Sequence, residues 1–193
     1  MELIRSFIAI ELPDELEARL KQLEDQLKSR RQTDVKWVDP SGIHLTLKFL
    51  GEVPAGKTEE ITAAIVESAR GIPPFRLETK ELGAFPNLRR VQVVWLGVGG
   101  ELDKLAPLQQ NIETNLEILG FEREARSFTP HLTLARLRQY ASPEERQALG
   151  EIIAKSKFEP PYAFKVESVS LMKSQLTPQG AIYTRLKSVP LKT

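Results

Sequence analysis

The sequence predicts an α+β protein with two pseudo-symmetric lobes, each a mainly antiparallel sheet with helices on its outer face, around a central cleft. Three observations support this fold class. Short β-forming runs are interspersed with amphipathic helical stripes, the tetrapeptide HLTL occurs twice, and no low-complexity linker divides the chain. With 193 residues and 41% hydrophobic content, we expect a single bilobal domain over residues 1–193.

The first half of the chain begins with a predicted strand and a predicted helix. Residues 5–12 (RSFIAIEL) are rich in β-branched and aromatic side chains, which favours a strand. From Pro13 onward, leucines at 16, 20, 23 and 27 form one helical stripe. The same reasoning predicts strands at 35–38, 43–50 and 75–79 and a helix near 59–70.

The second half repeats this mixture of elements. Ser142, Pro143 and Glu145 have the spacing of an N-cap, a first helical residue and a capping-box partner, so a helix is expected through Ile153. Apolar residues from 102 to 119 indicate another helix, although Pro107 makes its boundary uncertain. Strands are predicted at 91–98, 128–137, 164–171 and 181–186, with turn formers Thr177, Pro178 and Gly180 between the last two.

Composition narrows the classes of function. Lys and Arg together number 27 and Asp and Glu 26, so the chain lacks the general positive field of proteins that coat long nucleic acids. It has no cysteine, which excludes disulfides, thiolate zinc sites and a cysteine nucleophile. No apolar run approaches the roughly 18 residues of a membrane span, and the N-terminus does not resemble a secretory signal. We expect a soluble, cytoplasmic monomer that does not bind membranes.

The two copies of HLTL contain the only histidines of the chain, His44 and His131. Side chains of a strand alternate between its two faces, so His44 and Thr46 point the same way, roughly 6 to 7 Å apart. His131 and Thr133 repeat this arrangement, while the leucines between them face the core. A single histidine in a sheet is usually a hydrogen-bonded structural residue. The repeat instead favours a functional pair.

Two imidazoles and two hydroxyls are suited to displacement at phosphorus. A free imidazole titrates near pH 6.5, so one histidine can accept a proton while the other donates one. The hydroxyls of Thr46 and Thr133 can hold non-bridging phosphate oxygens. These residues alone do not show which histidine is the acid. A metal site is not indicated, because the H-x-T spacing provides no third ligand, and no cofactor is expected.

The paired motifs resemble the signature of the 2H phosphoesterase superfamily. The surrounding RSFIAIELP, HLTLKFLGEV, RRVQVVWLGV and SFTPHLTLAR resemble its bacterial and archaeal branch, the RNA 2′,3′-cyclic phosphodiesterases also called 2′-5′ RNA ligases. The resemblance covers nearly the whole chain.

This resemblance implies metal-independent hydrolysis of RNA or nucleotide 2′,3′-cyclic phosphate ends to a 2′-phosphate, with 2′-5′ ligation as the possible reverse reaction. It implies that His44 protonates the leaving oxygen and His131 activates water. It also implies that Thr46 and Thr133 bind the phosphate and that Arg136 contributes a positive charge. Strand alternation, however, places Arg136 on the face opposite His131 unless the strand ends or bulges.

Further candidates are less specific. Lys48 shares its parity with His44 and could extend into the cleft, and Arg89 and Arg90 could contact RNA phosphates. Each is more commonly a solvated charge. Three aromatic residues of the predicted strands could stack on a base, but we expect them in the core: Phe7, Phe49 and Trp95.

Two alternative functions are considered. Residues 51–58, GEVPAGKT, match the phosphate-loop pattern and lie between a predicted strand and helix, which would suit an NTPase or kinase. Pro54 lacks a backbone donor there, and Asp103, the only aspartate after the loop, does not follow an apolar strand. The second alternative is a module that binds RNA ends without turnover.

Overall fold

Nine strands form two antiparallel sheets in the part of the chain that the computed structural model describes, residues 2–30 and 34–193. Sheet A has the strand order β3 (His44–Pro54), β1 (Leu3–Glu11), β8 (Ser168–Thr177) and β9 (Gly180–Pro190). Sheet B has the order β2 (Val35–Trp37), β6 (His131–Leu137), β5 (Val93–Gly100), β4 (Phe75–Phe85) and β7 (Ala163–Val166). The predicted α+β class is confirmed.

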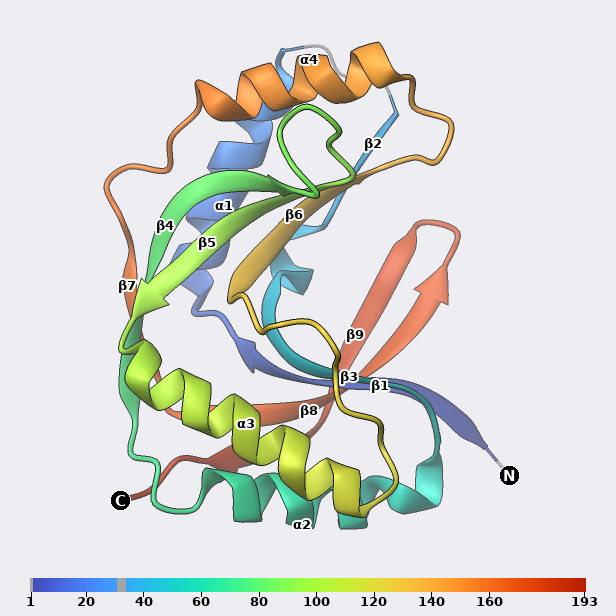
Figure 1. Cartoon of the computed structure of the whole chain (residues 1–193), viewed down its shortest axis with the longest axis vertical. Helices are drawn as coiled ribbons and strands as arrows, with labels where there is room; N and C mark the ends of the chain where they lie inside the picture. The colour runs from blue at the N-terminus through green and yellow to red at the C-terminus, as the bar shows by residue number, and fades with distance from the viewer. Residues whose placement is uncertain (1, 31–33) are drawn as a thin grey trace.

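Four α-helices cover these sheets in the described residues: α1 (Asp14–Lys28), α2 (Thr58–Ala69), α3 (Leu102–Ile118) and α4 (Pro143–Ala154). Figure 1 shows α2 and α3 below sheet A, and α1 and α4 behind and above sheet B. The short 3₁₀ helices η1 (Pro40–Gly42) and η2 (Ala55–Lys57) lie on either side of β3. No helix among the described residues is both long enough and apolar enough to cross a membrane.

The helices form as their sequences predict. The leucine stripe of α1 is buried, and Ser142 and Glu145 form the predicted capping box at the start of α4. Pro107 does not mark a boundary, because α3 continues through it. Buried residues of both sheets and all four helices belong to one continuous apolar cluster.

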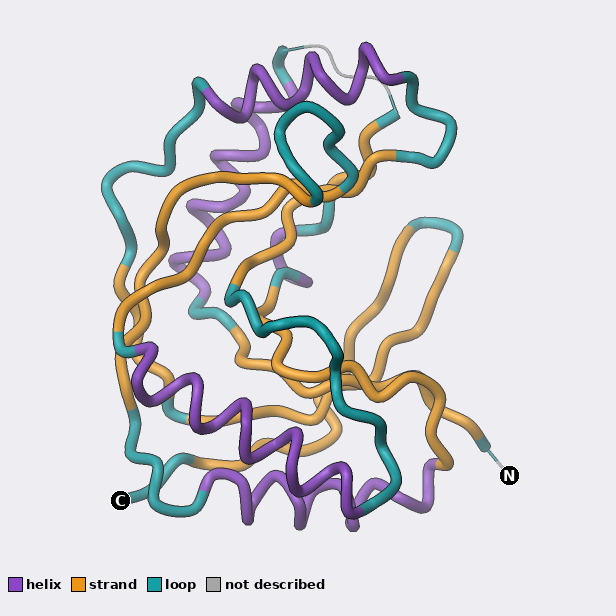
Figure 2. The backbone as a smooth tube through the Cα atoms, viewed as in Figure 1, coloured by secondary structure: helices purple, strands orange, loops and turns teal. Residues whose placement is uncertain are grey.

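The chain passes back and forth between the sheets. β1 belongs to sheet A, β2 to sheet B and β3 to sheet A again, and the C-terminal strands return to sheet A after β4–β7 (Figure 2). The single strand predicted for 164–171 is therefore wrong. Its first part, β7, pairs with β4 in sheet B, whereas its second part, β8, pairs with β1 in sheet A. Glu167 lies at the crossing.

A β-bulge interrupts each histidine strand at the same place in its motif. In β3, Thr46 pairs with Ala9 and Lys48 with Ile8, so Leu47 is the extra residue. In β6, Thr133 pairs with Trp95 and Ala135 with Val94, which leaves Leu134 as the extra residue. Because a bulge puts two consecutive residues on one face, the alternation of side chains shifts by one beyond each HLTL.

Candidate active site

The first histidine is fixed by the turn that precedes its strand. Asp39 caps η1 by accepting hydrogen bonds from the backbone N–H and hydroxyl of Ser41, at 2.9 and 2.6 Å. The chain then enters β3, and Nδ1 of His44 lies 2.7 Å from the carbonyl oxygen of Gly42. Since a carbonyl can only accept, Nδ1 carries the proton of this bond. Nε2 therefore remains as the reactive nitrogen.

The second histidine repeats this arrangement. Nδ1 of His131 lies 2.7 Å from the carbonyl oxygen of Thr129, again two residues upstream. Both rings thus have the same tautomer when neutral, with a proton on Nδ1 and a lone pair on Nε2. Such a nitrogen can accept a proton, and it can donate one once the ring is charged.

The threonines lie where strand alternation places them. His44 and Thr46 are half-buried while Leu45 and Leu47 are buried, and the β6 motif has the same pattern. The predicted shared face of each histidine and its threonine is therefore confirmed. We call the two sheet surfaces that carry these residues the histidine faces.

Beyond the motifs, the bulges reverse three expectations. Arg136 lies on the histidine face of β6, because Leu134 and Ala135 both point to the core. In β3 the buried pair is Leu47 and Lys48, so Lys48 does not reach the histidine face as the sequence suggested. Phe49 occupies the place on β3 that Arg136 occupies on β6, and the expectation that Phe49 is a core residue is wrong.

Lys48 forms a buried ion pair instead. Its Nζ lies 2.7 Å from Glu113 on α3 and donates a hydrogen bond of 2.7 Å to the carbonyl of Glu122. The pair therefore joins the outer face of sheet A to α3 and to the chain that follows it.

Aromatic rings enclose His44. Phe7 is 2% exposed and stacks on the imidazole at 4.5 Å between centroids, and Tyr183 meets it edge-on at 5.0 Å. Phe7 is buried as expected, but it packs on the histidine face with Ala9 and Met172 rather than in the main core. Burial lowers the pKa of His44, and the hydrogen bond to Gly42 only partly offsets this effect.

A carboxylate stands beside this ring. Glu11 is directly opposite His44 in the β1–β3 register, and its negative charge acts to raise the pKa of His44. Arg185 holds Glu11 through two hydrogen bonds of 2.7 and 3.2 Å, and the hydroxyl of Ser170 donates a third at 2.7 Å. Although burial opposes ionisation, these bonds keep the pKa of Glu11 below its ordinary value. Glu11 is therefore a fixed negative charge.

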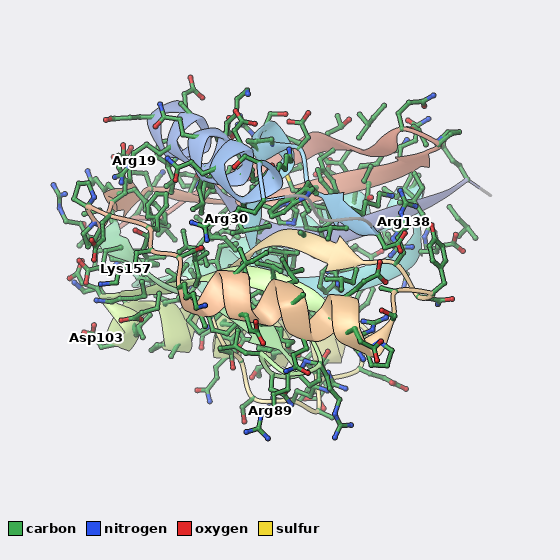
Figure 3. All side chains as sticks on the ribbon, turned by 90° about the horizontal axis from the view of Figure 1, so that it is seen from above. Arg19, Arg30, Arg89, Asp103, Arg138 and Lys157 are labelled. Atoms are coloured by element: carbon green, nitrogen blue, oxygen red, sulfur yellow. The ribbon has the colours of Figure 1, made fainter. Side chains whose placement is uncertain are left out.

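His131 has different neighbours. Phe85 meets its ring edge-on at 5.0 Å, and Trp95 lies 6.5 Å away. Trp95 is half-buried and packs over Gly83, where an added Cβ would lie 2.3 Å from the indole. Arg89 and Arg90 are exposed on the loop that follows Phe85, and Figure 3 shows Arg89 at the outer edge of the molecule.

The two histidine strands come from different sheets but lie next to each other. Residues of β3 and β6 are in contact, and Figure 1 shows the first residues of both strands in the middle of the molecule. An electrostatic interaction also links β6 to the surroundings of His44. Burial raises the pKa of Tyr183, which touches His44, and the positive charge of Arg136 on β6 opposes this rise. Arg136 is thus close to the neighbour of His44.

The structure also bears on the metal and phosphate-loop hypotheses. In the ranges 2–30 and 34–193, no three His, Asp or Glu side chains are grouped so that they could hold a metal ion. Residues 51–54 of the phosphate-loop pattern pair with β1 as part of β3, and only η2 separates them from α2. No loop that could wrap a phosphate is formed there.

Sequence reasoning missed the residues that surround His44. Glu11, Tyr183 and Arg185 carry no motif, and the last two reach the site only because β9 joins sheet A through β8. The sequence held one signal for a further residue on the histidine faces. Phe49 lies five residues after His44, just as Arg136 lies five residues after His131.

A pair of antiparallel sheets, each presenting a histidine with a threonine two residues later, defines the two-histidine class of phosphoesterases, the 2H superfamily. Within this class, the model of the 2′-5′ RNA ligase superfamily matches residues 12–178. The chain belongs to that family.

Curated relatives and solved structures agree with this assignment. Relatives named RNA 2′,3′-cyclic phosphodiesterase include one from Methanothermobacter thermautotrophicus, 36% identical over 95% of this chain and 97% of its own length. Another, from Thermotoga maritima, is 34% identical over 93% and 91%. A crystal structure from Thermus thermophilus has a TM-score of 0.77, 29% identity and coverage of 97% and 98%. E. coli LigT complexed with 3′-AMP has a TM-score of 0.77, 25% identity and complete coverage of both chains.

Proposed function

We propose that the chain hydrolyses RNA 2′,3′-cyclic phosphate ends to a 2′-phosphate by two-histidine general acid–base catalysis. Family membership and the printed names of the relatives support this activity. LigT, with which this chain shares its fold, has been crystallised with the mononucleotide 3′-AMP, which supports a site of nucleotide size. The proposal includes 2′-5′ ligation, in which a 5′-hydroxyl of RNA takes the place of water: its oxygen forms the bond to phosphorus as the P–O3′ bond breaks, which leaves a 2′-5′ phosphodiester and a free 3′-hydroxyl.

In the hydrolytic direction, Nε2 of neutral His131 accepts a proton from water. The water oxygen forms a bond to phosphorus while the P–O3′ bond breaks. The charged His44 donates its Nε2 proton to the departing 3′ oxygen, so that the 2′-phosphate remains. The hydroxyls of Thr46 and Thr133 donate to the non-bridging oxygens, and the guanidinium of Arg136 opposes their negative charge.

The observation that carries this mechanism is the matched Nδ1–carbonyl hydrogen bond of both histidines, 2.7 Å in each case. It fixes two imidazoles in one tautomer, each with its Nε2 available for proton transfer. A histidine that served only the fold would have no need of an identical partner on the neighbouring sheet.

The direct test is to incubate the protein with a 2′,3′-cyclic mononucleotide in EDTA and to identify the product isomer by ³¹P NMR. We expect the 2′-phosphate, and we expect His44→Ala and His131→Ala each to lower turnover by at least about 10²-fold. Circular dichroism shows whether the variants are folded. Tyr140→Ala, which removes an exposed aromatic residue outside the motif strands, is the matched control.

Several outcomes would refute this proposal. Near-normal rates in either histidine variant would remove the assigned role, and turnover that requires added metal would contradict direct acid–base catalysis. Binding of the cyclic nucleotide without turnover would support a module that only recognises RNA ends. The monomeric state and the cytoplasmic location expected from the sequence stay predictions.

A further inference from the structure

Arg5 is an exposed arginine on β1 to which the proposed mechanism gives no role. It lies on the histidine face, because alternate residues of a strand share a face and Phe7, two positions on, packs on His44. Its register partner on β3 is Glu52, yet in the described parts of the chain neither Glu52 nor any other carboxylate forms an ion pair with Arg5. Within those parts, Arg5 is an unpaired cation beside the candidate site.

The strand registers place Arg5 in one row with Tyr183. Arg5 pairs with Ser174 on β8, and Ser174 pairs with Tyr183 on β9, so the three residues lie side by side across three strands. Paired residues of antiparallel strands face the same side of the sheet, and Tyr183 packs edge-on against His44 at 5.0 Å. Arg5 and Tyr183 therefore project from the same surface of sheet A, with only the short side chain of Ser174 between them.

A second arginine approaches Tyr183 from the other sheet. Burial raises the pKa of Tyr183, and the positive charges of Arg136 on β6 and of Arg5 both oppose this rise. A 2′,3′-cyclic phosphate is a diester with a single negative charge. In the proposed mechanism Arg136 and the charged His44 already face that charge, so a substrate with one phosphate leaves Arg5 without an anion.

Phe7 separates Arg5 from His44 along β1. Its ring stacks on His44 at 4.5 Å between centroids, and Arg5 lies two residues from Phe7, roughly 6 to 7 Å along the strand. An anion bound by Arg5 is therefore displaced from an anion bound at His44. RNA supplies such a second anion, because every nucleotide adds one charged phosphate to the chain.

We propose that Arg5 binds the phosphodiester on the 5′ side of the terminal nucleotide, so that the site prefers RNA ends of two or more nucleotides to cyclic mononucleotides. The guanidinium donates hydrogen bonds to the non-bridging oxygens of that linkage and opposes its charge. This inference rests on the proposed function, since it concerns the substrate of the same site.

Arg89 on sheet B offers the competing contact. It is exposed on the loop that follows Phe85, and with Trp95 it lines a shallow pocket near His131. Figure 3, however, shows Arg89 at the outer edge of the molecule, whereas Arg5 shares a row with a residue that touches His44. The observations therefore favour Arg5.

Three substrates test the contact: a nucleoside 2′,3′-cyclic monophosphate, a dinucleotide with a 2′,3′-cyclic phosphate end, and the same dinucleotide with an uncharged methylphosphonate linkage. For Arg5→Gln we expect KM for the charged dinucleotide to rise roughly 3- to 10-fold, between the effects of an exposed ion pair and of a hydrogen bond to a charged group. Its kcat should be nearly unchanged, and KM for the other two substrates should not change. Added salt should reduce the difference between the wild-type protein and the variant.

Arg89→Gln is the matched control, since it removes another exposed arginine. It should leave KM for all three substrates unchanged, and circular dichroism shows whether both variants are folded. A loss that depends on the charge of the linkage in Arg89→Gln, but not in Arg5→Gln, would place the second phosphate on sheet B and overturn the inference.

Other outcomes separate this inference from the proposed function. If Arg5→Gln raises KM equally for the two dinucleotides, or equally for all three substrates, Arg5 does not recognise the charge of the linkage. An unchanged KM for the charged dinucleotide refutes the contact as well. In each case hydrolysis by the wild-type protein leaves the proposed function intact. If the wild-type protein hydrolyses none of the three substrates, the proposed function fails and the contact fails with it.

Discussion

At the scale of single residues, the two histidines share a tautomer but not an environment. His44 lies between Phe7 and Tyr183 beside the carboxylate of Glu11, whereas His131 lies against Phe85 and Trp95. An acid and a base need such unequal surroundings, because one must hold a proton that the other lacks. Burial lowers the pKa of His44, and Glu11 is the neighbouring group whose negative charge favours the charged imidazole.

The pH dependence of hydrolysis tests this role of Glu11. Burial lowers the pKa of His44 and Glu11 opposes that effect, so Glu11→Gln should lower the pKa of His44 further. A general acid acts below its pKa, and the alkaline limb of the kcat/KM profile should therefore move to lower pH. Activity at pH values above the pKa of His44 should fall several-fold, and it should approach that of the wild-type protein only in acid, where His44 is charged in both proteins.

Glu52→Gln is the matched control for this prediction, since Glu52 is an exposed carboxylate on β3 outside the motif. Its profile should coincide with that of the wild-type protein. If Glu11→Gln lowers activity equally at every pH, Glu11 acts only on the local structure.

Glu24 of α1 is a buried carboxyl group that should make the stability of the fold depend on pH. It is fully buried, Lys28 Nζ lies 3.3 Å from one oxygen, and no partner for the other oxygen is found in the described structure. Burial raises its pKa from 4.5 to about 7, so the folded protein prefers the neutral form. The unfolded chain ionises near pH 4.5, and stability should therefore fall as the pH rises from about 4.5 to about 7.

We expect Glu24→Gln to remove this part of the pH dependence. Urea unfolding of the wild-type protein should give a lower free energy of unfolding at pH 8 than at pH 5, by up to about 3 kcal/mol. The variant should lose much of that difference. Glu60→Gln, at an exposed position on α2, should behave like the wild-type protein. Equal pH dependence in all three proteins would argue against a buried neutral Glu24.

At the scale of secondary-structure elements, the bulges decide which side chains reach the site. Alternation alone correctly placed His44, Thr46, His131 and Thr133, because these residues precede the bulges. It misplaced Lys48 and Arg136 because each of them follows a bulge. The extra residue is Leu47 in one strand and Leu134 in the other, and leucine is an ordinary strand residue. The bulged residues therefore carry no local signal from which a single sequence would reveal the bulge.

The buried ion pair between β3 and α3 yields a prediction at this scale. Lys48→Met would leave the carboxylate of Glu113 buried without its cation, and we expect a loss of about 3–5 kcal/mol in the free energy of unfolding. Adding Glu113→Leu should recover much of this loss, because the unpaired charge is then gone. Urea unfolding of the single and double variants measures both effects.

Lys36→Met on β2 is the control, since Lys36 is exposed, and its effect should stay within about 0.5 kcal/mol. Additive losses in the double variant would show that Lys48 and Glu113 do not act as a pair.

At the scale of the whole molecule, the order of elements was largely predictable and their assignment to sheets was not. Hydrophobic periodicity and the Ser142 capping box located the helices, and β-rich runs located most strands. The run at 164–171 shows the limit of this reasoning. The sequence predicts one strand over β7 and β8, because β-forming residues continue through both segments. In the structure, however, each segment pairs with a different sheet. Long-range pairing of this kind depends on contacts that a local pattern does not contain.

The interleaved order of the strands has a consequence for synthesis in the cell. His44 leaves the ribosome early, but Ser170, Tyr183 and Arg185, which surround it and Glu11, belong to the last two strands. A nascent chain halted before β8 would lack the strand that pairs with β1 on the side opposite β3. It would also lack the side chains of β8 and β9 that contact His44 and Glu11. A fragment that stops before β8 should therefore fail to hydrolyse cyclic phosphate ends, because β8 and β9 complete the surroundings of His44.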